Sequence, residues 1–237
     1  MTGRARILDL YCCAGGAARG YADAGFEVVG VDIELQPRYP FCFEQGDALE
    51  VLRRLLAGGA VAGYRLEDFG AVHASPPCQS FTSYRRRGAG VGDGYPNLIG
   101  PTRELLVELG LPYVIENVEG ARSRLRAPVM LCGSSFGLDI RRHRLFECSF
   151  PLLAPSCDHS WQTPRFPAAS NRGRSSRRTV EIGVWRIPLA VQQQAMGGCD
   201  WMTLRELSQA IPPAFTEHIG GFLMAAVRDR LEARDAA

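Results

Sequence analysis

Short apolar runs alternate with amphipathic stretches through the first 147 residues of the chain. The apolar runs at residues 6–11, 27–31, 69–74 and 112–116 have the length of buried strands, and residues 49–56 follow a helical period. Apolar runs of this kind are typical of strands that are covered on both faces. Strands that alternate with helices favour a parallel sheet. The pattern therefore predicts an α/β fold with helices on both faces of the sheet.

The pattern changes after residue 149, where proline, serine and arginine become frequent and periodicity is lost. This composition predicts a small irregular lobe. Helical signals then return, because Thr203 and Glu206 have the form of a capping box and residues 213–230 carry one apolar stripe. We expect three parts: an α/β domain over 1–149, the small lobe over 150–195, and helices over 196–237 that return to the first domain.

A turn of small residues follows the first predicted strand. Its Gly15 and Gly16 let the backbone approach a ligand closely, and the amino terminus of the next helix favours a negative group. Asp32 ends the second predicted strand, 17 residues after Gly15, near the spacing at which an acid meets ribose hydroxyls. Asp47 offers a second acid before the next helix. The succession indicates a nucleoside cofactor and leaves open a dinucleotide or S-adenosylmethionine.

Cys78 follows the predicted strand 69–74 in the run Ser-Pro-Pro-Cys-Gln-Ser. The two prolines end the strand and stiffen the turn, because each fixes φ and removes a backbone donor. The thiol is thereby placed at the carboxyl end of a strand, where open α/β sheets bind their ligands. A reactive thiol also needs positive charge that lowers its pKa, and Arg85, Arg86 and Arg87 could supply it. With the turn and the acids, this favours a nucleophile over an inert cysteine.

Glu116 ends another apolar run, so we expect its carboxyl group at the same edge of the sheet as Cys78. A carboxyl group among apolar residues can hold a raised pKa and donate a proton. Arg142 and Arg144 alternate along a predicted strand over 140–147 and share a face, where two guanidinium groups suit a phosphate or a base edge. Taken singly, these residues are also explained as a solvated acid and a solvated basic strand.

Together these motifs resemble the DNA cytosine-5 methyltransferase family in its small, phage-like form, from residue 6 to about residue 220. The resemblance implies a Rossmann-like S-adenosylmethionine-dependent methyltransferase sheet with a target-recognition lobe. It implies that the Cys78 thiolate attacks carbon 6 of a cytosine flipped out of double-stranded DNA. Glu116 would hold a proton at ring nitrogen 3. Arg144 and Arg142 would position the base and the phosphate or stabilise the developing charge.

The resemblance also implies a pocket for S-adenosyl-L-methionine, whose methyl group goes to carbon 5 of the cytosine. The implied cofactor residues are Asp32 at the ribose, Ile33 at the adenine ring, Asp47 at the adenine amino group with Ala48 beside it, and Tyr11, Gly15 and Gly16 on the methionine side. Residues 210–214 resemble the family's last motif, which returns to the first strand and closes over the cofactor.

Three positions depart from the family pattern. Cys13 stands where the family has its first glycine, Ile140 stands where it has a glutamine before the arginines, and residues 208–209 are Ser-Gln in place of Gly-Asn. None of these changes removes the nucleophile or the proton donor. Two alternatives stay open: the same chemistry on RNA or with a larger carbon unit as donor, and a non-catalytic protein that binds cofactor and DNA.

The net charge of +2 is too small for binding nucleic acid by bulk charge, so contacts to double-stranded DNA must be local. Residues 171–178 contain four arginines among small residues and are predicted to be a mobile loop along phosphates, with a solvated linker as an equal alternative. The glycine-rich loop over 84–97 is predicted to be a hinge that closes over base and cofactor. The chain has no apolar run of the ~20 residues that span a bilayer and no signal segment, so we expect a cytoplasmic monomer, in a bacterial cell or a phage-infected host, without membrane contact.

Eight cysteines in a chain of this kind argue against a disulfide framework. Cys148, Cys157 and His159, with Cys132, come nearest to a metal cluster, yet their spacing matches no closed set of four ligands. We therefore predict reduced cysteines and no metal site. Of the remaining histidines, His73 and His218 lie in apolar sequence and are predicted to be packing residues.

Overall fold

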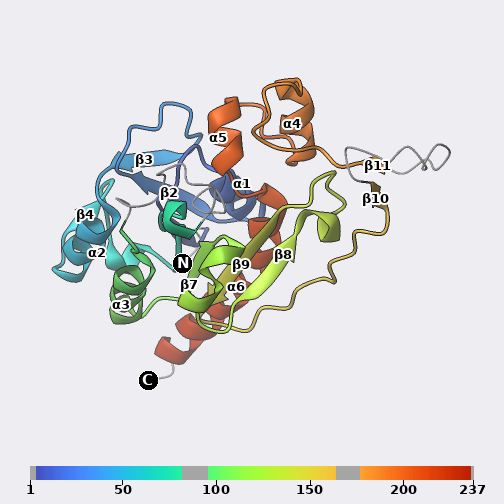
Figure 1. The fold of residues 1–237 in the computed structure, drawn as a ribbon. Coiled ribbons are helices and arrows are strands. Elements are labelled where there is room, and N and C mark those ends of the chain that lie inside the picture. The colour runs from blue at the N-terminus through green and yellow to red at the C-terminus, as the bar shows by residue number, and fades with distance from the viewer. Residues whose placement is uncertain (1–3, 82–95, 164–176, 236–237) are drawn as a thin grey trace.

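The computed structural model describes residues 4–81, 96–163 and 177–235. Its centre is a seven-stranded sheet with the order β3-β2-β1-β6-β7-β9-β8 (Figure 1). The strands are β1 (Arg6–Leu10), β2 (Glu27–Asp32), β3 (Cys42–Gln45), β6 (Ala71–Ala74), β7 (Tyr113–Asn117), β8 (Val129–Cys132) and β9 (His143–Cys148). The first five strands in this order pair in parallel, whereas β9 is antiparallel to both β7 and β8. The α/β prediction is confirmed, with the correction that one strand, β9, runs against the direction of the other six.

Helices cover both faces of the sheet, as the apolar runs predict. Successive side chains of a strand point to opposite faces, and in β1 Leu8 packs with α2 and α3 while Ile7 packs with α1 and α6. These helices are α1 (Gly16–Asp23), α2 (Ala48–Leu56), α3 (Ile99–Leu109) and α6 (Pro213–Asp235). Because both faces are buried, only the edges and ends of the strands are free to carry a site.

The strand order reverses beside β1, which pairs with β2 on one side and with β6 on the other. At such a switch point the connections leave neighbouring strands in opposite directions, and a crevice opens beyond their carboxyl ends. The small-residue turn follows β1 and the proline turn follows β6, so both predicted motifs lie at this crevice.

Helix α6 packs against α1, the helix that follows the small-residue turn (Figure 1). Its predicted stripe is buried, with Phe215, Ile219 and Leu223 facing the core. Gly20 lets the two helices touch, because a β-carbon there would lie 2.0 Å from the carbonyl oxygen of Pro213. The Thr216 hydroxyl donates a hydrogen bond of 2.9 Å to the carbonyl of Ala17 and joins the two helices.

Shorter elements fill the connections and the small lobe. They are β4 (Ala60–Val61), β5 (Tyr64–Arg65), η1 (Leu66–Asp68), η2 (Gln79–Phe81), η4 (Glu119–Arg124), η5 (Gly133–Phe136), β10 (Gln162–Thr163), β11 (Arg177–Arg178), α4 (Leu189–Ala195) and α5 (Leu204–Gln209). The predicted capping box is confirmed, since Thr203 and Glu206 bond reciprocally at the start of α5. The division of the chain into three parts stays a prediction. Residues 82–95 and 164–176, which hold most of both predicted loops, lie outside the described residues.

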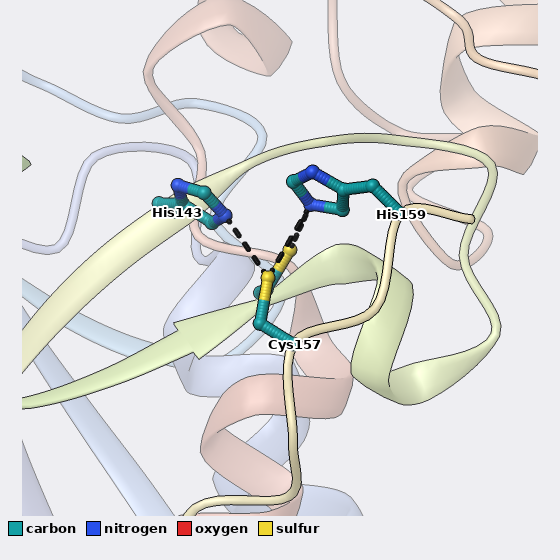
Figure 2. A group of neighbouring side chains, drawn as sticks. His143, Cys157 and His159 are labelled. Atoms are coloured by element: carbon teal, nitrogen blue, oxygen red, sulfur yellow. Dashed lines mark hydrogen bonds between the residues drawn. The ribbon is translucent and has the colours of Figure 1, made fainter. Parts of the chain in front are cut away.

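After β9 the chain runs from residue 149 to residue 161 without helix or strand and passes beside the β8–β9 hairpin. His143, Cys157 and His159 point toward one another where the two meet (Figure 2). All eight cysteines of the chain are free thiols in the structure. Within the described ranges, no helix is both long and apolar enough to cross a membrane.

Candidate active site

A cleft of about 690 Å³, its open mouth included, lies beyond the carboxyl ends of β1, β6 and β7. Five predicted site residues line it, from four different strands or the turns that follow them: Tyr11, Gly16, Cys78, Glu116 and Arg144. Open α/β sheets bind their ligands at this place, beyond the carboxyl ends of the strands. The fold therefore brings the predicted nucleophile and part of the predicted cofactor turn into one cavity.

The other six predicted residues do not line this cleft. They are Gly15, Asp32, Ile33, Asp47, Ala48 and Arg142. Asp32 adjoins the cleft, because its Oδ2 accepts the backbone N–H of Cys13 at 2.9 Å and Cys13 is a lining residue. Its Oδ1 accepts the N–H of Glu34, also at 2.9 Å. The carboxylate is thus held in place, and each oxygen keeps a second lone pair for a ligand.

Asp47 and Ile33, two other predicted cofactor residues, lie in surroundings that differ from those of Asp32. Asp47 caps α2, since its Oδ1 accepts the N–H groups of Leu49 and Glu50 at 2.9 and 3.0 Å. Neither bond uses Oδ2. Ala48 is the buried first residue of that helix, and Ile33 is 67% exposed. Their proposed contacts with an adenine stay predictions.

The turn that carries Cys78 is anchored by a residue of the neighbouring strand β7. Asn117 of β7 donates a hydrogen bond of 2.9 Å from Nδ2 to the carbonyl of Pro76, and its Oδ1 accepts the N–H of Val118 at 3.0 Å. The carbonyl of Cys78 accepts the N–H of Phe81 at 2.9 Å and closes the turn that begins η2. Because prolines fix φ on one side and Asn117 anchors the turn on the other, the thiol has a defined position in the cleft.

Glu116 and Arg144 form a buried ion pair, with Arg144 Nε 3.0 Å from Glu116 Oε1. Glu116 is 6% exposed. Burial raises the pKa of the Glu116 carboxyl group, while Arg144, Arg142 and the Ser75 hydroxyl act in the opposite direction. A buried carboxyl group whose pKa is raised can carry a proton to a substrate, as predicted from the sequence.

The surroundings of Cys78 raise the pKa of its thiol. Burial has the largest effect and the Glu116 carboxylate adds to it, while Arg144 and Arg142 lower the pKa without outweighing them. The expectation of a lowered pKa is therefore wrong for the described residues. The arginines at 85–87, which were expected to lower it, lie outside them. The raised pKa favours the protonated thiol over the thiolate.

A buried polar chain leads away from Glu116 into the core. His73 of β6 lies between Tyr21 and Ser75, with Nδ1 2.9 Å from the Tyr21 hydroxyl and Nε2 2.8 Å from the Ser75 hydroxyl. Burial lowers the pKa of His73 to about 3, so the ring is neutral. The sequence indicated only packing for His73. The structure adds that its Nε2 contacts the serine that hydrogen-bonds Glu116, while its Nδ1 contacts Tyr21.

Arg142 occupies a different position from the one predicted. Strand β9 begins at His143, so Arg142 precedes the strand and does not share a cleft-lining face with Arg144. Its Nη2 donates a hydrogen bond of 2.6 Å to the carbonyl of Ser208 at the end of α5. Burial, followed by the positive charge of Arg144, lowers the pKa of Arg142 to about 9. Its Nε is buried without a partner among the described residues.

The small-residue turn contains strained backbone. Tyr11 and Cys13 have φ values of 57° and 44°, and Gly15 has a φ of 84°. Positive φ is readily adopted by glycine and costs other residues on the order of 1–3 kcal/mol. Cys13 therefore pays a conformational cost at the position where the resembling family has a glycine.

Gly16 of the small-residue turn packs against residues 210–211, which belong to the segment that resembles the family's last motif. A β-carbon at Gly16 would lie 2.5 Å from the carbonyl oxygen of Ile211 and 3.2 Å from the side chain of Ala210. Both of these residues also line the cleft. The absence of a side chain at Gly16 thus lets residues 210–211 close one wall of the cavity.

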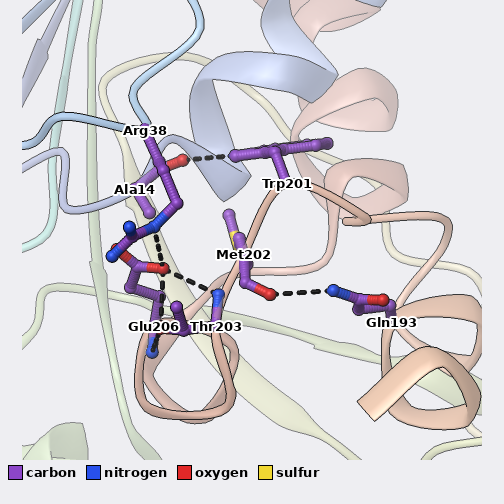
Figure 3. A network of polar contacts seen from close by, with 7 residues as sticks. All are labelled: Ala14, Arg38, Gln193, Trp201, Met202, Thr203 and Glu206. Atoms are coloured by element: carbon purple, nitrogen blue, oxygen red, sulfur yellow. Dashed lines mark hydrogen bonds and ion pairs between the residues drawn. The ribbon is translucent and has the colours of Figure 1, made fainter.

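The segment that follows α4 is hydrogen-bonded to the small-residue turn (Figure 3). The Trp201 indole donates a hydrogen bond of 2.7 Å to the carbonyl of Ala14, and Arg38 forms an ion pair of 2.8 Å with Glu206. Gln193 donates to the carbonyl of Met202 at 2.8 Å. Met202 and Glu206 line the cleft, whereas the sequence indicated only a helix-capping role for Glu206 and no role for Met202. Trp201 and Ala14 are 187 residues apart, which explains why local patterns missed the contact.

Asp9 is a further residue that the sequence analysis did not single out. It lines the cleft, is 1% exposed, and accepts a hydrogen bond of 3.2 Å from the Tyr39 hydroxyl on Oδ2. Burial raises the pKa of Asp9 to about 8, with a smaller contribution from Asp32. Its Oδ1 has no partner among the described residues. An unsatisfied buried carboxyl oxygen in a cavity wall points to a ligand that donates a hydrogen bond or carries positive charge.

Comparison with protein-family models and with curated proteins found no match. The fold itself is well represented among solved structures and is a Rossmann-like methyltransferase fold, as predicted. A prophage-encoded protein of E. coli that is assigned as a DNA modification methyltransferase aligns over 94% of this chain and 99% of its own, with a TM-score of 0.60 and 14% identity.

Two eukaryotic methyltransferases align over the same share of the chain. The S. pombe Dnmt2 methyltransferase matches with a TM-score of 0.55 and 14% identity, over 94% of this chain and 98% of its own. The Entamoeba histolytica methyltransferase EhMeth matches with a TM-score of 0.56 and 10% identity, over 94% and 99%. At these identities the likeness extends to the fold, and the chemistry of this chain has to be argued from its own residues.

Proposed function

We propose that this protein transfers a methyl group from S-adenosylmethionine to carbon 5 of a cytosine that is flipped out of duplex DNA. One observation carries the proposal: a single cleft holds the Cys78 thiol, the buried Glu116–Arg144 pair and the turn that contains Gly16. A nucleophile, a proton carrier and a close-approach turn are the three parts that this reaction requires.

The residues of the cleft fit the proposed cofactor. S-adenosylmethionine, when bound, supplies an activated methyl group beside a cationic sulfur, an ammonium group and a ribose. The unpartnered Oδ1 of Asp9 would accept a hydrogen bond, and a positive charge of the cofactor would favour loss of the Asp9 proton. Asp32 is fixed by two backbone N–H groups next to the turn and keeps lone pairs for ribose hydroxyls. Ile33 and Asp47 would contact the adenine.

Cys78 and Glu116 would act together on the base. The Cys78 thiol would release its proton to water and Sγ would form a bond to carbon 6, while the electron pair of the 5,6 double bond moves into the ring toward carbon 5 and nitrogen 3. Glu116 would hold its proton against nitrogen 3, so that less negative charge accumulates there. Carbon 5 would then be nucleophilic enough to accept the methyl group, with release of the neutral thioether of the donor. Transfer of the carbon 5 proton to water would re-form the 5,6 double bond and break the bond between Sγ and carbon 6.

Arg144 would orient Glu116 and stabilise negative charge in the cleft. Its guanidinium group lowers the pKa of both Glu116 and Cys78, so it favours the thiolate that attacks the base. Arg142 acts from outside the cleft wall, through its charge and through its bond to Ser208. We assign it a positioning role.

Double-stranded DNA is the proposed substrate because the structural neighbour encoded in a prophage is assigned to DNA modification. A stacked base cannot reach the cleft, so the target cytosine would have to be flipped out of the duplex. The four arginines of residues 172–178 would lie along phosphates. The protein would act as a monomer.

The experiment is a nucleoside analysis by mass spectrometry. Mixed-sequence duplex DNA and RNA of the same sequence are incubated separately with the protein and methyl-labelled S-adenosylmethionine, beside a Cys78→Ala control. Labelled 5-methylcytosine in DNA, made by the wild type alone, is the expected result. Label in RNA alone transfers the assignment to RNA, and no label with intact cofactor binding identifies a non-catalytic binder.

A second reagent tests the covalent step. A duplex with 5-fluorocytosine is incubated with the protein and S-adenosylmethionine. After methyl transfer, carbon 5 carries fluorine and no proton, so the bond from Sγ to carbon 6 cannot break by elimination. The wild-type protein should become attached to this duplex through the peptide that contains Cys78, and Cys78→Ala should not. Equal attachment of both proteins, or attachment through another cysteine, would refute the assigned nucleophile.

A further inference from the structure

Four metal-ligating side chains converge beside the β8–β9 hairpin, away from the cleft. They are Cys132, His143, Cys157 and His159, and one ligand atom from each lies within 4.8 Å of all the others. Figure 2 shows the side chains of His143, Cys157 and His159 directed at one point between the hairpin and the segment that follows it. The linear spacing of these residues matches no familiar motif, so the sequence alone predicts no metal site.

The separations match those of zinc ligands. His159 Nε2 lies 3.2 Å from Cys132 Sγ and 3.4 Å from Cys157 Sγ, and His143 Nε2 lies 3.5 Å from Cys157 Sγ. In a tetrahedral zinc site with bonds of about 2.3 Å to sulfur and about 2.1 Å to nitrogen, a sulfur and a nitrogen ligand lie about 3.6 Å apart. The group therefore closes around a metal with shifts of at most about 1 Å.

Hydrogen bonds among the four side chains explain the cluster less well than a metal does. The Nε2 atom of His159 faces both sulfur atoms, yet a ring nitrogen has either one lone pair or one N–H to offer. Cys157 in turn faces two ring nitrogens with a single S–H. A cation at the centre accepts a lone pair from all four atoms at once.

An outer set of contacts supports the ligand atoms. Glu119 Oε2 lies 3.3 Å from Nδ1 of His143, the ring nitrogen that faces away from the cluster. A carboxylate behind a ligating histidine fixes the tautomer and orientation that zinc needs. The Ser134 hydroxyl donates to Cys132 Sγ at 3.1 Å, a contact that suits a thiolate.

We propose that Cys132, His143, Cys157 and His159 bind one Zn²⁺ ion. The site has four protein ligands of the two types that close structural zinc sites, so its role is structural. Cys132 and His143 are register partners across the hairpin, and Cys157 and His159 come from the segment after β9. The ion therefore ties that segment to the hairpin.

Zinc binding would affect two regions, the start of β9 and the entry into the predicted recognition lobe. His143 lies in the chain between Arg142 and Arg144, so the ion fixes the start of the strand that carries Arg144 into the cleft. Three residues after His159, Gln162 donates from Nε2 to the carbonyls of Leu138 and Ile140 at 2.9 and 3.2 Å. Metal binding thus anchors the entry into the predicted recognition lobe.

The first test measures metal content and coordination in the full chain. Protein purified without chelator should contain one zinc per chain by elemental mass spectrometry. Replacement by Co²⁺ should give visible d–d bands of tetrahedral intensity and a thiolate-to-cobalt charge-transfer band. Absence of bound zinc after purification and after added Zn²⁺ would refute the site, as would a cobalt spectrum without the charge-transfer band.

Matched variants locate the ion. Cys157→Ser and His159→Ala should each lower the zinc content at least tenfold, whereas Cys42→Ser, on the exposed edge strand β3, should keep one zinc per chain. Equal loss from all three variants would contradict the assignment. A disulfide between Cys132 and Cys157, found by peptide mapping of freshly purified protein, would also refute it.

Because ligand variants can fail to fold, the wild type provides an independent readout. A zinc chelator should lower its thermal midpoint, and added Zn²⁺ should restore it, with no substrate or S-adenosylmethionine present. A midpoint that does not respond to either treatment would overturn the structural role. This readout does not depend on activity, so it separates failure of the zinc site from failure of the proposed function.

Discussion

Arg144 Nε lies 3.0 Å from Glu116 Oε1, and the same guanidinium group lowers the pKa of the Cys78 thiol. One positive charge therefore stabilises both negative groups of the candidate active site. Burial acts against it at both positions. Burial therefore keeps the pKa of each group above its ordinary value, and Arg144 limits the rise at both.

Arg144→Leu should raise the pKa of Cys78 and slow methyl transfer by about 10²-fold or more at neutral pH, because a preorganised charge is lost. Peptide-resolved alkylation of Cys78 across a pH series measures the change, with the exposed Cys42 as an internal standard. Arg141→Leu is the control, since Arg141 is a neighbouring arginine outside the cleft lining. An unchanged alkylation profile for Cys78 would show that Arg144 does not act on the thiol.

Cys13→Gly should stabilise the protein by about 1 kcal/mol and tighten cofactor binding, because it relieves a positive φ at the cofactor turn. Chemical denaturation and equilibrium dialysis with S-adenosylmethionine measure the two effects. Ala14→Gly, in the same turn but without positive φ, should instead lower stability. If both glycine variants lose stability, strain at Cys13 is not the cause.

Gly16→Ala should weaken cofactor binding and cost about 1–3 kcal/mol of stability, because the added methyl group collides with the backbone of Ile211. Gly221→Ala in α6 is the matched control, since a β-carbon there meets nothing within 4 Å. That change should stabilise the helix by about 0.5–1 kcal/mol. Thermal melts with and without S-adenosylmethionine distinguish the two, and normal cofactor binding by Gly16→Ala would contradict the assigned wall.

Asp9 should make the unliganded protein less stable as pH rises. Its pKa is about 8 in the folded state and 3.8 as the ordinary value, so the folded state binds the extra proton between these limits. The free energy of unfolding should then fall by about 1.4 kcal/mol per pH unit across this window as far as Asp9 contributes. Asp9→Asn should flatten the dependence in denaturation series at pH 5 and pH 8. Identical slopes for wild type and Asp9→Asn would disprove the shift.

The sequence was sufficient to predict the features that depend on strand ends. Cys78, Glu116, Tyr11 and Gly16 follow or end apolar runs, and parallel strands deliver such residues to one edge of the sheet. The prediction of Arg142 was less accurate, because alternation fixes a face only inside a strand and β9 begins one residue later.

The features that the sequence did not predict depend on contacts between residues that are far apart in the chain. Asp9 reads as one polar residue in an apolar strand, and only the cleft shows that its Oδ1 is unpartnered. The four proposed zinc ligands meet because antiparallel pairing sets Cys132 opposite His143, a relation that linear spacing does not contain. The Trp201 contact with Ala14 likewise requires the folded chain.

The bond between Thr216 and Ala17 joins positions that are 199 residues apart. A chain that emerges from the ribosome at about 5–20 residues per second therefore presents α1 for roughly 10–40 seconds before α6 exists to cover it. Contacts of such large sequence separation form late in folding, because loop closure must precede them. Synthesis itself thus delays assembly of the turn beside α1 until residues 213–235 have been made.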